Sequence, residues 1–174
     1  MTLDYTVHGQ VQITIIDFLD EVLTAFDEAE PKGGGTKTSA APENIFKVYK
    51  DCEKLPQSNT VQFHNLVAKT LYATKRDRPD TCTAVAFITT RVRAPDQDDW
   101  DKMVHMMRYI RGTRTLPLIL SANGSGNLKW WVDASFAVHP NMQGHSSGGF
   151  SLGRVFPIVS STKQKLNTRI STET

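Results

Sequence analysis

A chain of 174 residues suits one ordinary domain or parts of two small ones. No stretch approaches the roughly 18 apolar residues of a membrane span, and the start of the chain lacks the basic and apolar regions of a secretory signal. Cys52 and Cys82 form no Cys-x-x-Cys pair and suggest no disulfide framework. We therefore expect an intracellular protein, cytoplasmic or nuclear, that is neither secreted nor held in a membrane.

The net charge of +2 hides an asymmetry along the chain. Residues 102–174 contain nine Lys or Arg but only two acidic residues, Asp133 and Glu173, which gives +7, whereas residues 1–101 carry −5. A basic C-terminal part favours contact with phosphate groups. The plainer alternative is a solvated basic surface.

Residues 1–30 predict a β-hairpin followed by a helix. Residues 11–15 alternate apolar and polar side chains, and a short turn at residues 8–10 separates them from residues 3–7. From Asp17, a plausible N-cap, the period becomes helical. The apolar stripe of this helix consists of Phe18, Leu19, Val22, Leu23 and Phe26.

Residues 31–58 predict a linker, and residues 31–42 are rich enough in Gly, Pro, Ser and Thr to predict a flexible one. Its glycines, Gly33 to Gly35, do not lie between a strand and a helix, and no Gly-Lys-Ser/Thr follows. A nucleotide-binding loop is therefore not expected.

Residues 59–114 predict three helices. The first ends at residues 76–80, because a proline disfavours helix at the residue before it, and Pro79 then suits the first turn of the second helix. The third covers residues 96–111 and stops at Gly112. The apolar stripes of the three helices are Phe63, Leu66, Val67 and Leu71; Val85, Phe87, Ile88 and Val92; and Trp100, Met103, Met107 and Ile110. We interpret the methionines as core packing.

Residues 115–174 predict an antiparallel meander, which makes the fold class α+β. Strands are expected at residues 116–120, 128–135, 147–152 and 155–160, with a turn at residues 123–127.

Asp133 is the most informative single residue, because it places a carboxylate in an apolar strand directly after Trp130 and Trp131. Burying an unpaired carboxylate is costly, so a partner is expected. Three interpretations remain open: a turn cap, a pair with a basic neighbour, or a metal ligand. Two-metal chemistry requires several converging carboxylates, and Glu173 is the only other acid after residue 101.

Three other groupings predict less. Asp98 and Asp99 follow Pro95 at the start of a helix, where acids favour the positive end of the dipole, so we interpret them as capping residues. Asp133, Ser135 and His139 are close in sequence, but a catalytic triad is defined by geometry, and nothing in the sequence orients His139. His139, His145 and Cys82 lack zinc-ligand spacing.

Several strings in residues 59–174 resemble, in order and spacing, the polyprotein of copia-type LTR retrotransposons at the junction between reverse transcriptase and ribonuclease H. They are residues 68–80, 83–87, 108–113, 132–135 and 160–164, and they include Arg78-Pro79-Asp80, Tyr109-Ile110-Arg111-Gly112-Thr113 and Asp133-Ala134-Ser135. Residues 1–58 resemble the end of the polymerase palm followed by thumb and linker. The resemblance implies a truncated chain, with polymerase palm and thumb over residues 1–30, a linker over 31–58, thumb and connection helices over 59–114, and an incomplete ribonuclease H-like meander over 115–174.

The resemblance also implies functional residues. Asp133 corresponds to the first metal-binding Asp of ribonuclease H, and the intact family uses Mg²⁺. The family's next ligand is the second Glu of a Ser-Thr-Glu-Ala-Glu string, whereas this sequence reads Ser171-Thr172-Glu173-Thr174 and stops. Glu173 is a poor substitute, because two positions along a helix correspond to about 200° of rotation. The polymerase aspartate pair corresponds to positions before Met1, so we expect an incomplete enzyme that does not bind Mg²⁺ tightly.

Lys163, Lys165 and Arg169 alternate with Ser, Thr and Gln, which suits phosphate contact without base readout. The alternative is an exposed edge strand protected by lysines. The expected partners are an RNA–DNA hybrid or another nucleic acid, and the rest of the polyprotein. A non-catalytic module that binds nucleic acid or a polymerase, and a transposon relic without function, remain the alternatives.

Overall fold

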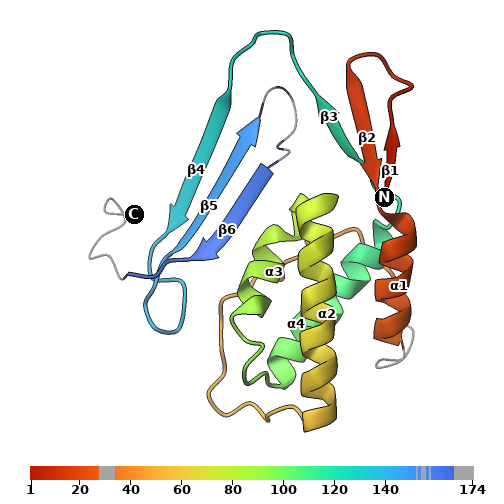
Figure 1. Ribbon diagram of the computed structural model, residues 1–174. Helices are drawn as coiled ribbons and strands as arrows, with labels where there is room; N and C mark the ends of the chain where they lie inside the picture. Colours follow the sequence, from red (N-terminus) through yellow and green to blue (C-terminus); the bar gives the residue numbers. More distant parts are fainter. Residues whose placement is uncertain (28–33, 152, 154–155, 157, 167–174) are drawn as a thin grey trace.

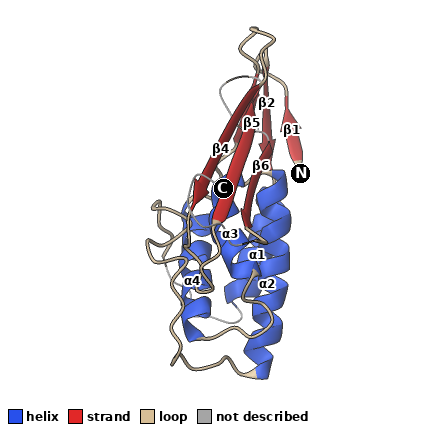
Figure 2. Ribbon diagram, turned by 90° about the vertical axis from the view of Figure 1, so that its left-hand side faces the viewer, coloured by secondary structure: helices blue, strands red, loops and turns tan. Residues whose placement is uncertain are grey.

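The computed structural model describes residues 1–27, 34–151, 153, 156 and 158–166. Its described part has four α-helices and two three-stranded antiparallel sheets, with strand orders β1-β2-β3 and β4-β5-β6, which confirms the α+β class (Figures 1 and 2). The elements are β1 (Thr2–Asp4), β2 (Gln10–Thr14), α1 (Ile16–Asp27), α2 (Gln57–Arg76), the 3₁₀ turn η1 (Pro79–Thr81), α3 (Cys82–Thr89), α4 (Gln97–Gly112), β3 (Leu118–Ser121), β4 (Lys129–Ser135), β5 (His145–Ser151) and β6 (Ile158–Lys163).

The hydrophobic core lies among the four helices, and most of the predicted apolar stripes face it. Leu71 is an exception, because it is exposed, and Val92 lies beyond the end of α3 and is only partly buried. Met103 and Met107 are fully buried, so their interpretation as core packing is confirmed. Asp17 is not the N-cap, because α1 already begins at Ile16. Its carboxylate lies in the first turn, near the positive end of the helix dipole.

The buried guanidinium of Arg78 joins two sequence strings that are far apart in the chain. Arg78 is 1% exposed and donates to Asp80 at 2.7 Å and to the hydroxyl of Thr113 at 2.6 Å. Tyr109 donates its hydroxyl to Asp80 at 2.6 Å, and its ring lies 5.3 Å from the guanidinium. Burial opposes the charge, but hydrogen bonds and attraction from Asp80 raise the pKa of Arg78 above its usual value. This network fixes the start of η1 to the end of α4.

The connection from α1 to α2 packs against the helices, although its composition predicts a flexible linker. The Thr36 amide donates to the Arg108 carbonyl at 3.0 Å, and Ala40 and Ile45 are buried in the core. Gly112 is the last residue of α4, whereas the sequence predicted a helix that ends at residue 111 with Gly112 as the stop, and Gly112 has no positive φ. Its missing side chain makes room for the connection, because a Cβ there would lie 2.0 Å from the Thr36 carbonyl oxygen.

Strand β3 does not belong to the C-terminal meander, which corrects the expected topology. It pairs with β2, with Val11 opposite Leu120, and so completes the sheet that the N-terminal hairpin begins. The carboxylate of Asp77 accepts a hydrogen bond from the Leu118 amide and holds the start of β3 beside the end of α2. Residues 122–128 then lead to the second sheet, which contains only β4, β5 and β6 among the described residues.

The second sheet meets the helices along one side. Strand β6 packs against α3, and β4 is the strand farthest from the helices (Figure 1). A short bridge between Ala122 and Gly153 also links the two sheets. Within the described part of the chain, β4 therefore has one edge paired with β5 and one open edge.

We predict that Gly112→Ala destabilises the protein by about 1–3 kcal/mol, because the added methyl group collides with backbone atoms of Thr36. The sign of the change in the free energy of unfolding is informative, because alanine by itself stabilises a helix interior by about 1 kcal/mol relative to glycine. Urea unfolding monitored by circular dichroism measures the change.

Gly34→Ala is the matched control, because a Cβ at Gly34 meets nothing within 4 Å and the residue has no positive φ. Its free energy of unfolding should stay within about 0.5 kcal/mol of the unsubstituted chain. Equal effects of the two substitutions would contradict the proposed packing role of Gly112.

Candidate functional site

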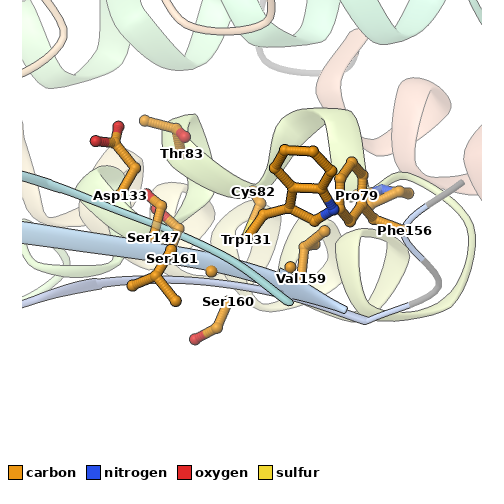
Figure 3. A pocket seen from close by; sticks show the side chains of 13 residues that line it. Pro79, Cys82, Thr83, Trp131, Asp133, Ser147, Phe156, Val159, Ser160 and Ser161 are labelled. Atoms are coloured by element: carbon orange, nitrogen blue, oxygen red, sulfur yellow. The ribbon is translucent and has the colours of Figure 1, made fainter. Parts of the chain in front are cut away.

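A cavity of about 390 Å³ lies between α3 and the sheet β4-β5-β6, and Asp133 lines it. The ladder places Asp133 opposite Ser147, and Ser147 opposite Ser161, so one carboxylate and two hydroxyls form a row across the three strands. Figure 3 shows Asp133 and Thr83 at one end of this cavity, with Trp131 and Phe156 at the other. Those two rings pack edge to face, 6.0 Å between centroids.

The strand that carries Asp133 is exposed, which corrects the expectation of a buried charge. Trp130 is 71% exposed and Val132 is 81% exposed, and the side chain of Asp133 is exposed as well. Among the described residues, no ion pair or side-chain hydrogen bond involves the Asp133 carboxylate. The cost of burying a charge therefore does not explain why the strand contains one.

The residues around Asp133 do not fit a pair of Mg²⁺ ions. Two-metal catalysis needs several carboxylates around the ions, but the other polar side chains that line the cavity are hydroxyls and the thiol of Cys82. Burial raises the pKa of that thiol, which keeps it protonated and a poor ligand. Glu173 and Arg169 lie outside the described residues.

Among the described residues, three carboxylates meet only at the start of α4, in Asp96, Asp98 and Asp99. Asp96 and Asp99 form a capping box, and Arg91 bonds both of them at 2.9–3.1 Å. Asp98 pairs with Lys102 at 2.8 Å. The capping interpretation is thus confirmed for Asp99, and the cluster is already neutralised by cations of the chain rather than open to a metal ion.

The structure brings together His139, His145 and Ser161, a grouping that sequence reasoning missed. The His139 Nε2 and His145 Nδ1 atoms lie 3.1 Å apart, and the His145 Nε2 atom lies 2.6 Å from the Ser161 hydroxyl oxygen. Both imidazoles are buried, at 2% and 4% exposure. The sequence grouping of Asp133, Ser135 and His139 is therefore not a triad, because His139 contacts His145 instead.

Ser161, His145 and His139 have the order of a nucleophile, a base and an orienting residue. Catalysis would require a negative charge on the third group, which a histidine does not carry. Burial, Lys163 and His145 lower the pKa of His139 from 6.5 to about 4, and burial also lowers the pKa of His145. A neutral His139 cannot stabilise a protonated His145 as a carboxylate would. We interpret the pair as a structural anchor.

The anchor joins three parts of the fold. The ring of His139 stacks on Phe87 of α3, with a centroid distance of 6.2 Å, and packs edge-on against Phe46 of the α1–α2 connection at 5.1 Å. His145 is the first residue of β5 and contacts Phe46 at 5.0 Å. The two histidines thus attach the C-terminal sheet to the helical core.

A second cavity, of about 280 Å³, lies beside β6, between α2 and α3. Lys75 of α2 and Lys163 of β6 line it, together with threonine and serine hydroxyls, and no carboxylate does. Lys163 is half-buried and Lys165, just beyond β6, is exposed. Leu71, Val85 and Ala86 supply an apolar part of the lining. Two of the three predicted phosphate-contacting residues therefore lie at or next to a cavity that two lysines and several hydroxyls share with apolar side chains. Lys75 was missed, although it belongs to one of the strings that resemble the retrotransposon family.

Comparison of the sequence with protein family models, and of the chain with curated proteins and solved structures, found no match. None of the described helices combines the length and the apolar composition that a membrane crossing requires.

We predict that acidification destabilises the protein through the histidine pair. Both pKa values are lowered in the folded state, so the unfolded chain binds more protons between about pH 6.5 and the folded pKa, which is about 4 for His139. The free energy of unfolding should therefore fall as the pH falls through this range. Urea unfolding at pH 7.5 and at pH 5.0 measures the difference.

In His139→Gln, the free energy of unfolding should differ less between pH 7.5 and pH 5.0 than it does in the unsubstituted chain, whatever the stability of the variant at pH 7.5. His64 is exposed on α2, and His64→Gln is the matched control that should keep the full difference. An unchanged difference in His139→Gln would refute the role of the pair.

Proposed function

We propose that the chain is part of a copia-type LTR retrotransposon polyprotein, from the end of the reverse transcriptase to the start of the ribonuclease H-like region. We further propose that this part binds nucleic acid through its phosphates and does not itself catalyse strand cleavage. The sequence strings support the family, and the arrangement of charges around β6 supports the binding role.

The carrying observation is the basic cavity beside β6. Lys75 and Lys163 come from separate elements and line one opening without a carboxylate, and Ser161 and Thr162 line the same opening. Cations with neighbouring hydroxyls recognise phosphate oxygens and carry no base readout. An RNA–DNA hybrid, or another nucleic acid, is thus the partner that best suits the site.

The surroundings of Asp133 support the proposal that this part does not cleave nucleic acid. One exposed carboxylate among hydroxyls is too little for two-metal phosphoryl chemistry. Asp133 lies on β4, at the opposite edge of the sheet from β6, and it does not line the cavity that contains Lys75 and Lys163. The residues proposed to bind phosphate are therefore different from the residue that resembles a metal ligand.

We predict that the chain binds an RNA–DNA hybrid in a salt-dependent way, and that replacing Lys163, Lys165 and Arg169 together by Gln weakens this binding. Each lost phosphate contact should reduce the slope of log K against log salt concentration by about 0.9, so the triple variant should lose about 2–3 units of slope. Fluorescence anisotropy across a salt series measures the slope.

The matched control replaces three exposed cations outside the C-terminal sheet, Lys37, Lys50 and Arg93, and changes the net charge equally. This control should bind with a nearly unchanged slope. If both triple variants lose the same affinity, net charge and not the β6 region is responsible. Absence of binding even at low salt would refute the proposed function.

We also predict that the purified chain does not cleave the RNA strand of a labelled hybrid in the presence of Mg²⁺. Denaturing gel electrophoresis tests this expectation. Mg²⁺-dependent cleavage that disappears in Asp133→Asn would contradict it and restore an enzymatic role.

A further inference from the structure

We propose that β4 pairs with β4 of a second copy of this chain, antiparallel and centred on Trp131, to form a continuous six-stranded sheet. The inference does not depend on the proposed function. It rests on the open edge of β4 and on the order of side chains along it.

The free edge of β4 is long and regular. All seven residues of β4 pair one to one with β5, without a bulge, and β4 is the terminal strand of its sheet in the described part of the chain. Six of its seven residues are exposed. An edge strand normally avoids pairing through proline, bulges, short length or charges in its middle. β4 has none of the first three, and its two charged residues, Lys129 and Asp133, have opposite signs.

The two charges of β4 are self-complementary. Lys129 and Asp133 are its only charged residues, and each is two positions from Trp131. An antiparallel pair centred on Trp131 therefore places Lys129 of each copy opposite Asp133 of the other, and the twofold axis makes both pairs identical. Neither side chain has an ion-pair partner among the described residues of its own chain. Directly opposed, opposite charges stabilise an antiparallel ladder.

The uncharged side chains fit the same register. Trp130 falls opposite Val132 of the second copy, and these are two of the most exposed apolar side chains of the protein, at 71% and 81%. An aromatic side chain facing a β-branched one is a favourable cross-strand pair. Trp130 already contacts Phe150 of β5, with ring centroids 5.3 Å apart, so the pairing would extend an apolar row across both sheets.

The other described sheet edges suit a second copy less well. Strand β6 packs against α3, and β1 and β3 have only three and four residues. Both charges needed for pairing lie in β4 itself, at equal distances from Trp131, which favours a second copy over an unrelated strand. The exposed carboxylate of Asp133 then has a basic partner, which it lacks among the described residues of its own chain.

Charge reversal tests the register. Lys129→Asp and Asp133→Lys each place like charges opposite one another in both symmetric pairs, and each should raise the dimer dissociation constant roughly tenfold or more. The double variant K129D/D133K exchanges the charges and should restore the dissociation constant to within about threefold of the original. Sedimentation equilibrium across a concentration series measures these constants.

Mixing the two single variants provides a second test. Lys129→Asp carries two acids on β4, and Asp133→Lys carries two bases. The mixture should therefore form heterodimers at concentrations at which each variant alone stays monomeric. Circular dichroism of each variant confirms that the fold is retained. A monomeric original chain at concentrations near 100 μM, single variants that dimerise normally, or a failure of both the double variant and the mixture to restore association would each overturn the proposal.

Discussion

The buried guanidinium of Arg78 is the interaction on which the rest of the structure depends. It lies between the turn that follows α2 and the end of α4, and it bonds Asp80 and Thr113 while Tyr109 covers it. Removing one partner from such a site leaves a buried charge or a buried donor uncompensated, which is strongly destabilising. The adjacent Asp77 holds the start of β3, so the same short segment also sets the course of the chain into the first sheet.

The C-terminal sheet is attached to this core more narrowly. Strand β6 packs against α3, and the His139–His145 pair is packed between Phe46 and Phe87. The attachment lies along one side of the sheet, so β4 remains at the opposite side with its edge and both tryptophans exposed. Both features follow from the strand order, because β6 at one edge of the three-stranded sheet contacts α3 and β4 forms the other edge.

These two features separate the possible roles of the C-terminal part. Near the helices, Lys75 and Lys163 line a cavity without carboxylates, which suits phosphate. At the opposite edge of the sheet from β6, Asp133 stands on the exposed strand with Lys129, which suits strand pairing. A carboxylate in an aromatic strand is a metal ligand only when other carboxylates converge on it, and the cavity that Asp133 lines supplies hydroxyls instead.

The helices, most of their buried stripes, the N-terminal hairpin and the capping role of Asp99 are predictable from the sequence, because periodicity and capping depend on residues close in the chain. The basic character of the β6 region was also predictable from local composition. Only the tertiary structure decided that β3 joins β2, that Gly112 makes room for Thr36, and that His139 meets His145. Strand alternation does not specify which strand becomes the neighbour, and close approach between distant segments leaves no periodic signal. Likewise, the exposure of Asp133 depends on how many strands and helices cover its sheet, which is a property of the assembled fold.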